Sequence, residues 1–127
     1  MDMSAAISLF DQDARVAAVY LLGSAMQDDH LRPDSDVDLA LLPMPGFTLT
    51  PAELIEMSAQ LSESFRRPVD LGVMSSRNLV YARQALLGGQ RVFSRDTSHV
   101  EFMAASLLGQ YARFEDDRRE VVRAYSA

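Results

Sequence analysis

The sequence contains no cysteine and no tryptophan among its 127 residues. Without cysteine, the chain can form no disulfide, no thiolate zinc site and no cysteine nucleophile. It also lacks an apolar run long enough to span a membrane. The first residues carry Asp2, Asp11 and Asp13 where a secretory signal would be basic. Together these absences predict a cytoplasmic protein that does not bind a membrane.

Basic residues are also scarce, with 12 arginines and no lysine against 18 aspartates and glutamates and a formal charge of −6. This balance argues against a broad basic surface, so we expect no direct binding of a polynucleotide. The hydrophobic content of 48% is enough for a core. We therefore expect a single domain over 1–127, with its core at about 10–95 and a C-terminal helix at about 99–125.

Alternating apolar runs and turn residues predict strands and helices in turn, which is typical of an α+β fold with a small mixed α/β sheet flanked by helices. Pro43 to Gly46 end the second strand, and Pro68 ends the helix before the third. The expected elements are a helix at 4–10, strands at 16–22 and from Asp36 to Pro43, a helix from Pro51, a strand around Asp70, a helix at about 77–87 and a strand at 90–94.

Three helices carry more specific signals. Thr50, Pro51 and Glu53 form a capping box with proline at the first helical position, ahead of a buried stripe. In the next helix, Ser75 or Ser76 is the expected cap, Gly88 and Gly89 the stop, and the expected core residues are Leu79, Val80, Leu86 and Leu87.

The last helix should begin with a capping box of Ser98 and Glu101. Its apolar residues recur every three or four positions: Val100, Met103, Leu107, Tyr111 and Phe114. Such a stripe packs on the domain's own sheet or, in its later part with Val121, Val122 and Tyr125, docks a partner protein.

Asp36 and Asp38 are the first candidate functional residues. Residues i and i+2 of a strand point to the same face, so both carboxylates should share one face while Val37 and Leu39 pack into the core. Two adjacent anions repel each other. A divalent cation removes this cost, and magnesium prefers carboxylate oxygens, water and substrate phosphates.

Gly23 and Ser24 follow the apolar run at 16–22. A glycine can turn sharply and allow backbone N–H groups to approach a phosphate, and the serine adds a hydroxyl. An EF-hand is a competing interpretation, because Asp34, Asp36 and Asp38 have the spacing of its first ligands. It fails, since Leu39 and Pro45 stand where that loop needs glycine and glutamate.

Residues 21–42 read LLGSAMQDDHLRPDSDVDLALL. This order of Gly-Ser, loop and Asp-x-Asp resembles the minimal nucleotidyltransferases of the DNA polymerase β-like superfamily. The resemblance implies that Asp36 and Asp38 bind catalytic Mg²⁺, and that Gly23 and Ser24 hold the triphosphate of ATP. Arg32, in the lead-in to the second strand, is either a further phosphate ligand or a solvated loop charge.

The resemblance also requires a third carboxylate on a later strand, and Asp70 meets this requirement. Two metals bound by Asp36, Asp38 and Asp70 would stabilise the attacking and leaving oxygens, with Asp70 accepting the proton of the attacking hydroxyl.

A small stand-alone member resembles the antitoxins paired with HEPN-domain ribonuclease toxins, where AMP is attached to a toxin tyrosine. The implied partner is therefore a cognate HEPN toxin, with which the chain would form a hetero-oligomer. Two alternatives stay open: an antitoxin that acts by binding alone, and a transferase for a small molecule such as an aminoglycoside.

Overall fold

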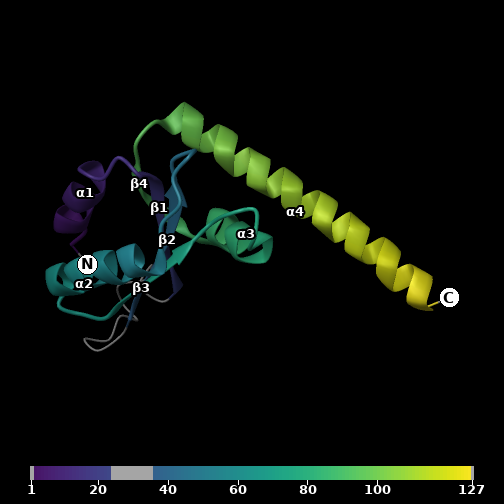
Figure 1. The fold of residues 1–127 in the computed structure, drawn as a ribbon, viewed down its shortest axis with the longest axis horizontal. Coiled ribbons are helices and arrows are strands. Elements are labelled where there is room, and N and C mark those ends of the chain that lie inside the picture. Colours follow the sequence, from purple (N-terminus) through teal and green to yellow (C-terminus); the bar gives the residue numbers. More distant parts are fainter. Residues whose placement is uncertain (1, 24–35, 127) are drawn as a thin grey trace.

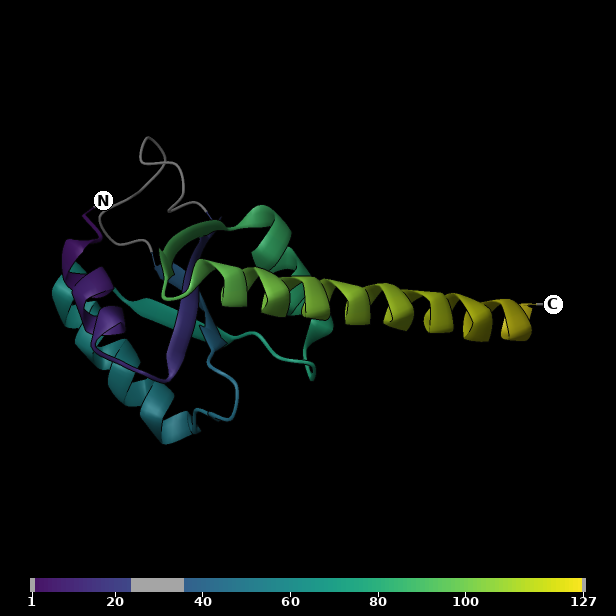
Figure 2. The ribbon, with the colours of Figure 1, turned by 90° about the horizontal axis from the view of Figure 1, so that it is seen from above.

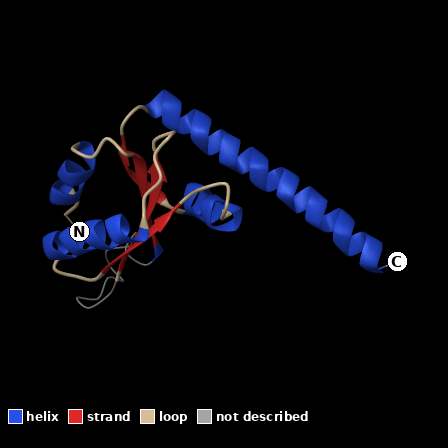
Figure 3. Ribbon diagram, in the orientation of Figure 1, coloured by secondary structure: helices blue, strands red, loops and turns tan. Residues whose placement is uncertain are grey.

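The computed structural model describes residues 2–23 and 36–126, which form four helices and a four-stranded sheet (Figures 1 and 3). In chain order the elements are α1 Ser4–Asp11, β1 Val16–Leu22, β2 Val37–Pro43, α2 Pro51–Phe65, β3 Val69–Val73, α3 Leu79–Gly88, β4 Gln90–Ser94 and α4 Thr97–Ser126. None of the helices in this described part is both long and apolar enough to cross a membrane.

The sheet is mixed, with the strand order β3-β2-β1-β4. β1 pairs antiparallel with both β2 and β4, whereas β2 and β3 run parallel. The end of β1 therefore lies beside the start of β2, which in turn lies beside the start of β3. This α+β arrangement confirms the fold class expected from the sequence.

Helices cover the two faces of the sheet in pairs, α1 and α2 on one side and α3 and α4 on the other (Figure 1). On the α1/α2 side, Val37, Leu39 and Leu41 of β2 are fully buried, as the strand period predicts. The opposite face of the same strand carries Ala40 and Leu42, which pack with residues of α3 and α4. Alternation along β2 thus fixes which face presents Asp38.

Helix α2 begins as the capping box predicts. The Glu53 N–H donates to the Thr50 hydroxyl at 3.1 Å, and the Thr50 N–H donates to the Glu53 carboxylate at 3.0 Å. Proline occupies the first position, and Met57 and Leu61 are buried.

Helix α3 begins at Leu79, two residues later than expected, and neither Ser75 nor Ser76 caps it. The Asn78 side-chain amide donates to the Val73 carbonyl at 2.6 Å and accepts from the Ser75 N–H at 2.8 Å, which holds the preceding residues in a turn. The predicted core was also partly wrong. Val80 and Leu87 are 52% and 61% exposed, and the buried residues are the small Ala82 and Ala85.

The expected capping box of α4 is replaced by Asp96, whose carboxylate accepts the His99 N–H at 3.2 Å. The helix starts at Thr97 and buries Val100 and Leu107. Beyond these residues it extends past the rest of the structure (Figure 2). Phe114, Val121, Val122 and Tyr125 are between 43% and 88% exposed.

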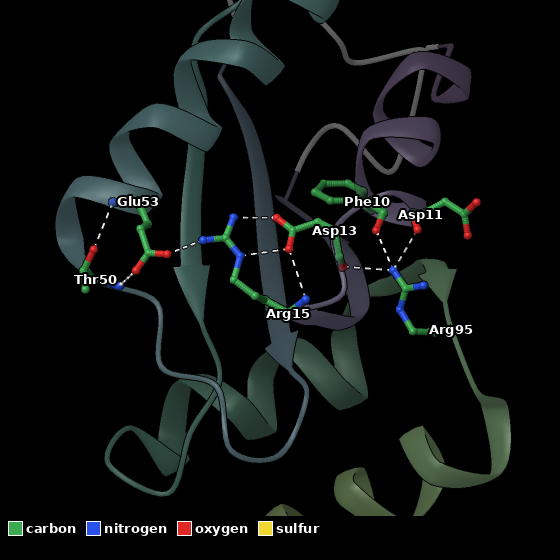
Figure 4. Close-up of polar contacts among 7 residues, drawn as sticks. All are labelled: Phe10, Asp11, Asp13, Arg15, Thr50, Glu53 and Arg95. Carbon is green, nitrogen blue, oxygen red and sulfur yellow. Dashed lines mark hydrogen bonds and ion pairs between the residues drawn. The ribbon is translucent and has the colours of Figure 1, made fainter.

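Where β1 begins, two arginines connect the N-terminal segment to the sheet and to α2 (Figure 4). Arg15 forms an ion pair with Asp13 at 2.7 Å and another with Glu53. The Arg95 guanidinium donates to the carbonyls of Phe10, Asp11, Asp13 and Val16 at 2.8–3.1 Å. The Arg15 guanidinium lowers the pKa of Asp13 below its ordinary value, chiefly through the side-chain hydrogen bond. We name these residues, Asp13, Arg15, Glu53 and Arg95, the arginine clip.

Candidate active site

Asp38 and Asp70 are direct neighbours in the sheet. They occupy the same register position of the parallel β2/β3 pair, near the starts of both strands. On each side of Asp38 the chain buries an apolar residue, Val37 and Leu39, against α1 and α2. The carboxylate of Asp38 is therefore directed to the α3/α4 face.

Asp36 lies one residue before β2 and is exposed. Its carboxylate still acts electrostatically on Asp38. The structure thus brings all three predicted carboxylates to one end of the sheet, with Asp38 in the middle.

Gly23 borders Asp38 from the other side. Leu22 pairs with Asp38, and Gly23 follows with φ +69°, a left-handed conformation that glycine adopts without strain. A Cβ atom at Gly23 would lie 3.3 Å from the Asp38 Oδ2. Because Gly23 has no side chain, its backbone is exposed directly beside the Asp38 carboxylate. Ser24 and Arg32, the other two residues predicted to contact the nucleotide, lie outside the described residues.

The electrostatics of Asp38 show a concentration of negative charge. Burial raises its pKa above the ordinary value, and the charges of Asp70 and then Asp36 raise it further. All three causes favour the protonated carboxyl group, so ionisation of Asp38 in the folded protein costs free energy. A bound cation would offset this cost.

The chemistry of these donors fits magnesium, although the described residues include no group of three or more acidic or histidine side chains close enough to hold a metal ion by themselves. Mg²⁺ is usually bound through one or two carboxylates, with water and substrate phosphates completing its ligands. Asp38 and Asp70 are adjacent hard-oxygen donors, so they meet this requirement.

Tyr81 of α3 is a residue near the site that the sequence did not indicate. A Cβ atom at Gly72 would lie only 2.0 Å from the Tyr81 hydroxyl oxygen, so the phenol rests directly on the bare backbone of β3. Burial raises the Tyr81 pKa above its ordinary value, as do the charges of Asp70 and then Asp38. Gly72 was the available signal, since a glycine inside a strand often marks a close approach.

Among protein families, the chain matches Polymerase beta, Nucleotidyltransferase, over residues 5–98. No curated protein matches the sequence. Similar solved structures include a toxin–antitoxin complex with AMP-PNP, at 23% identity, full coverage of both chains and a TM-score of 0.77.

A mutant of the toxin–antitoxin MntA-HpeT is similar at 22% identity, full coverage of both chains and a TM-score of 0.78. The tri-AMPylated Shewanella oneidensis HEPN toxin in complex with MNT antitoxin is similar at 22% identity and a TM-score of 0.72, with 98% of this chain and 95% of that chain covered. These likenesses support the same fold. Because the family match covers most of the sequence, the chain belongs to the polymerase beta nucleotidyltransferase family.

Proposed function

We propose that this protein is a magnesium-dependent adenylyltransferase that moves AMP from ATP to a tyrosine hydroxyl of a cognate HEPN toxin and so neutralises it. The observation that carries the proposal is the pairing of Asp38 with Asp70, with the Gly23 backbone on the opposite side of Asp38. This arrangement offers carboxylates for a cation beside a backbone that a phosphate can approach closely.

The reaction forms a bond between the acceptor oxygen and the α-phosphorus of ATP, and the bond from that phosphorus to pyrophosphate breaks. Asp36, Asp38 and Asp70 would hold magnesium, and Asp70 accepts the proton of the acceptor hydroxyl. Gly23, Ser24 and Arg32 contact the phosphates. When bound, magnesium neutralises charge on the phosphates, which would otherwise be repelled by the three aspartates.

A protein acceptor is supported by α4. The second half of this helix carries Phe114, Val121, Val122 and Tyr125, all with large exposed fractions. Contiguous exposed apolar side chains are typical of surfaces that bind a partner protein. The similar solved structures named above are complexes of a toxin with an antitoxin, one with AMP-PNP and one with an AMPylated toxin. They supply the partner and the nucleotide of the proposal.

The test uses the purified chain, Mg²⁺, and the protein encoded beside it, with ATP labelled at the α- or the γ-phosphate. We expect α-label on a tyrosine of the neighbouring protein and no γ-label, because AMP transfer keeps only the α-phosphate. Asp38→Asn should abolish labelling, whereas the control Glu63→Gln, on the exposed surface of α2 and away from α4, should leave it unchanged.

Other results would contradict the proposal. Stable association and inhibition without label would indicate an antitoxin that acts by binding alone. Label on an aminoglycoside, but not on protein, would indicate a small-molecule transferase.

A further inference from the structure

Tyr81 occupies a defined place relative to the three carboxylates. Across the sheet, the order is Gly23 after β1, Asp38 on β2 and Asp70 on β3. Tyr81 reaches from α3 onto Gly72, two residues beyond Asp70. Asp38 is therefore flanked by the Gly23 backbone on one side and by Asp70 with Tyr81 on the other.

The hydroxyl of Tyr81 is free to bind a ligand. In the described part of the chain the structure gives it no hydrogen bond, although it lies close enough to Asp70 and Asp38 for their charges to act on the phenol. The missing side chain of Gly72 is what allows this position, because any Cβ there would overlap the hydroxyl oxygen, at 2.0 Å. A half-buried hydroxyl without a protein partner usually bonds to water or to a substrate.

Tyr81 also lines a groove of about 510 Å³ formed by residues of α3, the segment before it and α4. Arg77, Gln84 and Phe114 also line it. The volume falls within the range of ligand pockets, roughly 300–1,000 Å³. Tyr81 thus belongs both to the carboxylate end of the sheet and to a groove that leads from α3 to the helix with the exposed apolar residues.

We propose that Tyr81 binds the acceptor substrate, its hydroxyl forming a hydrogen bond to the acceptor hydroxyl beside Asp70 and its ring forming a wall for the acceptor's polypeptide segment in the groove. This inference rests on the proposed function. It divides the site between its two substrates: the triphosphate lies on the Gly23 side of Asp38, and the acceptor lies on the Tyr81 side. Tyr81 orients the acceptor oxygen toward the α-phosphorus while the acceptor proton passes to Asp70.

Because the two substrates are proposed to bind on opposite sides of Asp38, a substitution at Tyr81 should change the KM for the acceptor and not the KM for ATP. Tyr81→Phe removes only the hydroxyl, so the KM for the acceptor protein should rise about 3- to 10-fold, the effect of one lost hydrogen bond. The KM for ATP should stay within about twofold, as should the affinity for AMP-PNP with Mg²⁺ measured by calorimetry, because the nucleotide lies on the other side of Asp38. Tyr81→Ala also removes the groove wall and should raise the acceptor KM further.

Tyr111→Phe is the matched control. The Tyr111 hydroxyl donates to the Glu115 carboxylate on the same helix, α4, at 3.1 Å, and not to a residue of the candidate site. This variant should leave both KM values unchanged, and thermal unfolding of all variants verifies that each is folded.

An unchanged acceptor KM in folded Tyr81→Phe, alongside normal wild-type transfer, would overturn the inference and leave the proposed function intact. A rise in the KM for ATP alone would also overturn it, since Tyr81 would then contact the nucleotide. A wild-type chain that transfers no AMP would overturn both.

Discussion

The two ends of the sheet differ in how their charged residues are arranged. Where β1 begins, the arginine clip pairs opposite charges, and Arg95 donates to four backbone carbonyls. Where β1 ends, Asp36, Asp38 and Asp70 bring like charges together, and burial followed by the charges of Asp70 and Asp36 raises the pKa of Asp38.

This difference indicates a division of tasks within one small sheet. Paired charges and satisfied carbonyls stabilise the N-terminal segment against the strands and α2. Carboxylates held close together destabilise the folded state, and proteins retain such arrangements where the carboxylates bind a ligand. The comparison predicts that substitutions at the clip change stability, whereas substitutions at the carboxylates change activity.

The largest stability effect should follow from Arg95→Ala. The guanidinium spans the end of α1 and the start of β1, so its loss removes the hydrogen bonds by which one side chain joins these two segments. We expect the free energy of unfolding in urea to fall by about 1–3 kcal/mol.

Arg119→Ala serves as the control for Arg95, because within residues 2–23 and 36–126 Arg119 forms only an exposed ion pair with Asp116 at 3.8 Å. Its effect should stay below about 0.5 kcal/mol. Equal effects of the two substitutions would show that the clip does not stabilise the fold.

Gly72→Ala should have a smaller effect, at the carboxylate end. The new Cβ would overlap the Tyr81 phenol and force it to move, which we expect to cost about 1–2 kcal/mol of unfolding free energy. In a double-mutant cycle, Tyr81→Ala should relieve part of this cost, because it removes the overlapping atoms. Strictly additive losses would contradict the contact. Gly88→Ala is the control, since a Cβ at Gly88 meets no atom within 4 Å.

The smallest predicted effect is a gain in thermal stability. Asp38→Asn removes one charge from the cluster and should raise the thermal midpoint at neutral pH by on the order of 2 °C. The folded-state pKa of Asp38 is raised. The stability contribution of this carboxyl is therefore greatest at pH values below its unfolded pKa, and it is lost as pH rises through the folded pKa.

The gain from Asp38→Asn should accordingly shrink as the pH falls through the raised folded-state pKa and be lost below about 4, where Asp38 is protonated in both states. Unfolding followed from pH 3 to pH 7 would measure this. A loss of stability at neutral pH would show that Asp38 makes a stabilising contact instead of a repulsive one.

Much of the fold was predictable, because its signals are local. The apolar run at 16–22 and the Thr50–Glu53 capping box gave β1 and the start of α2. The alternation at Asp36 to Leu41 correctly predicted that Val37 and Leu39 share a buried face, but it did not predict that Ala40 and Leu42 on the other face are buried as well. These features depend on residues close together in the sequence.

The predictions from the sequence were wrong where a tertiary contact determines the local structure. Asn78 bonds to the end of β3, and α3 begins only after it. The residues that α3 buries, Ala82 and Ala85, join a cluster with side chains from β1, β2 and α4 that are distant in the sequence. The sequence predicted Ser98 as the cap of α4, and the structure uses Asp96 instead. In the candidate site, Asp38 and Asp70 could be named from spacing and resemblance. Tyr81 could not, since only the packing of α3 on β3 brings it to Gly72.

The central claim is that the carboxylate end catalyses AMP transfer and the clip end only stabilises the fold. The most direct test is transfer of α-labelled AMP to the proposed partner protein by two matched variants, Asp38→Asn and Glu53→Gln. Asp38→Asn should lower the transfer rate on the order of a thousandfold while the protein stays folded, because metal stabilisation is worth several kcal/mol. Glu53→Gln should keep near-normal transfer below its unfolding temperature. Near-normal transfer by Asp38→Asn, or an equal loss in both folded variants, would contradict the claim.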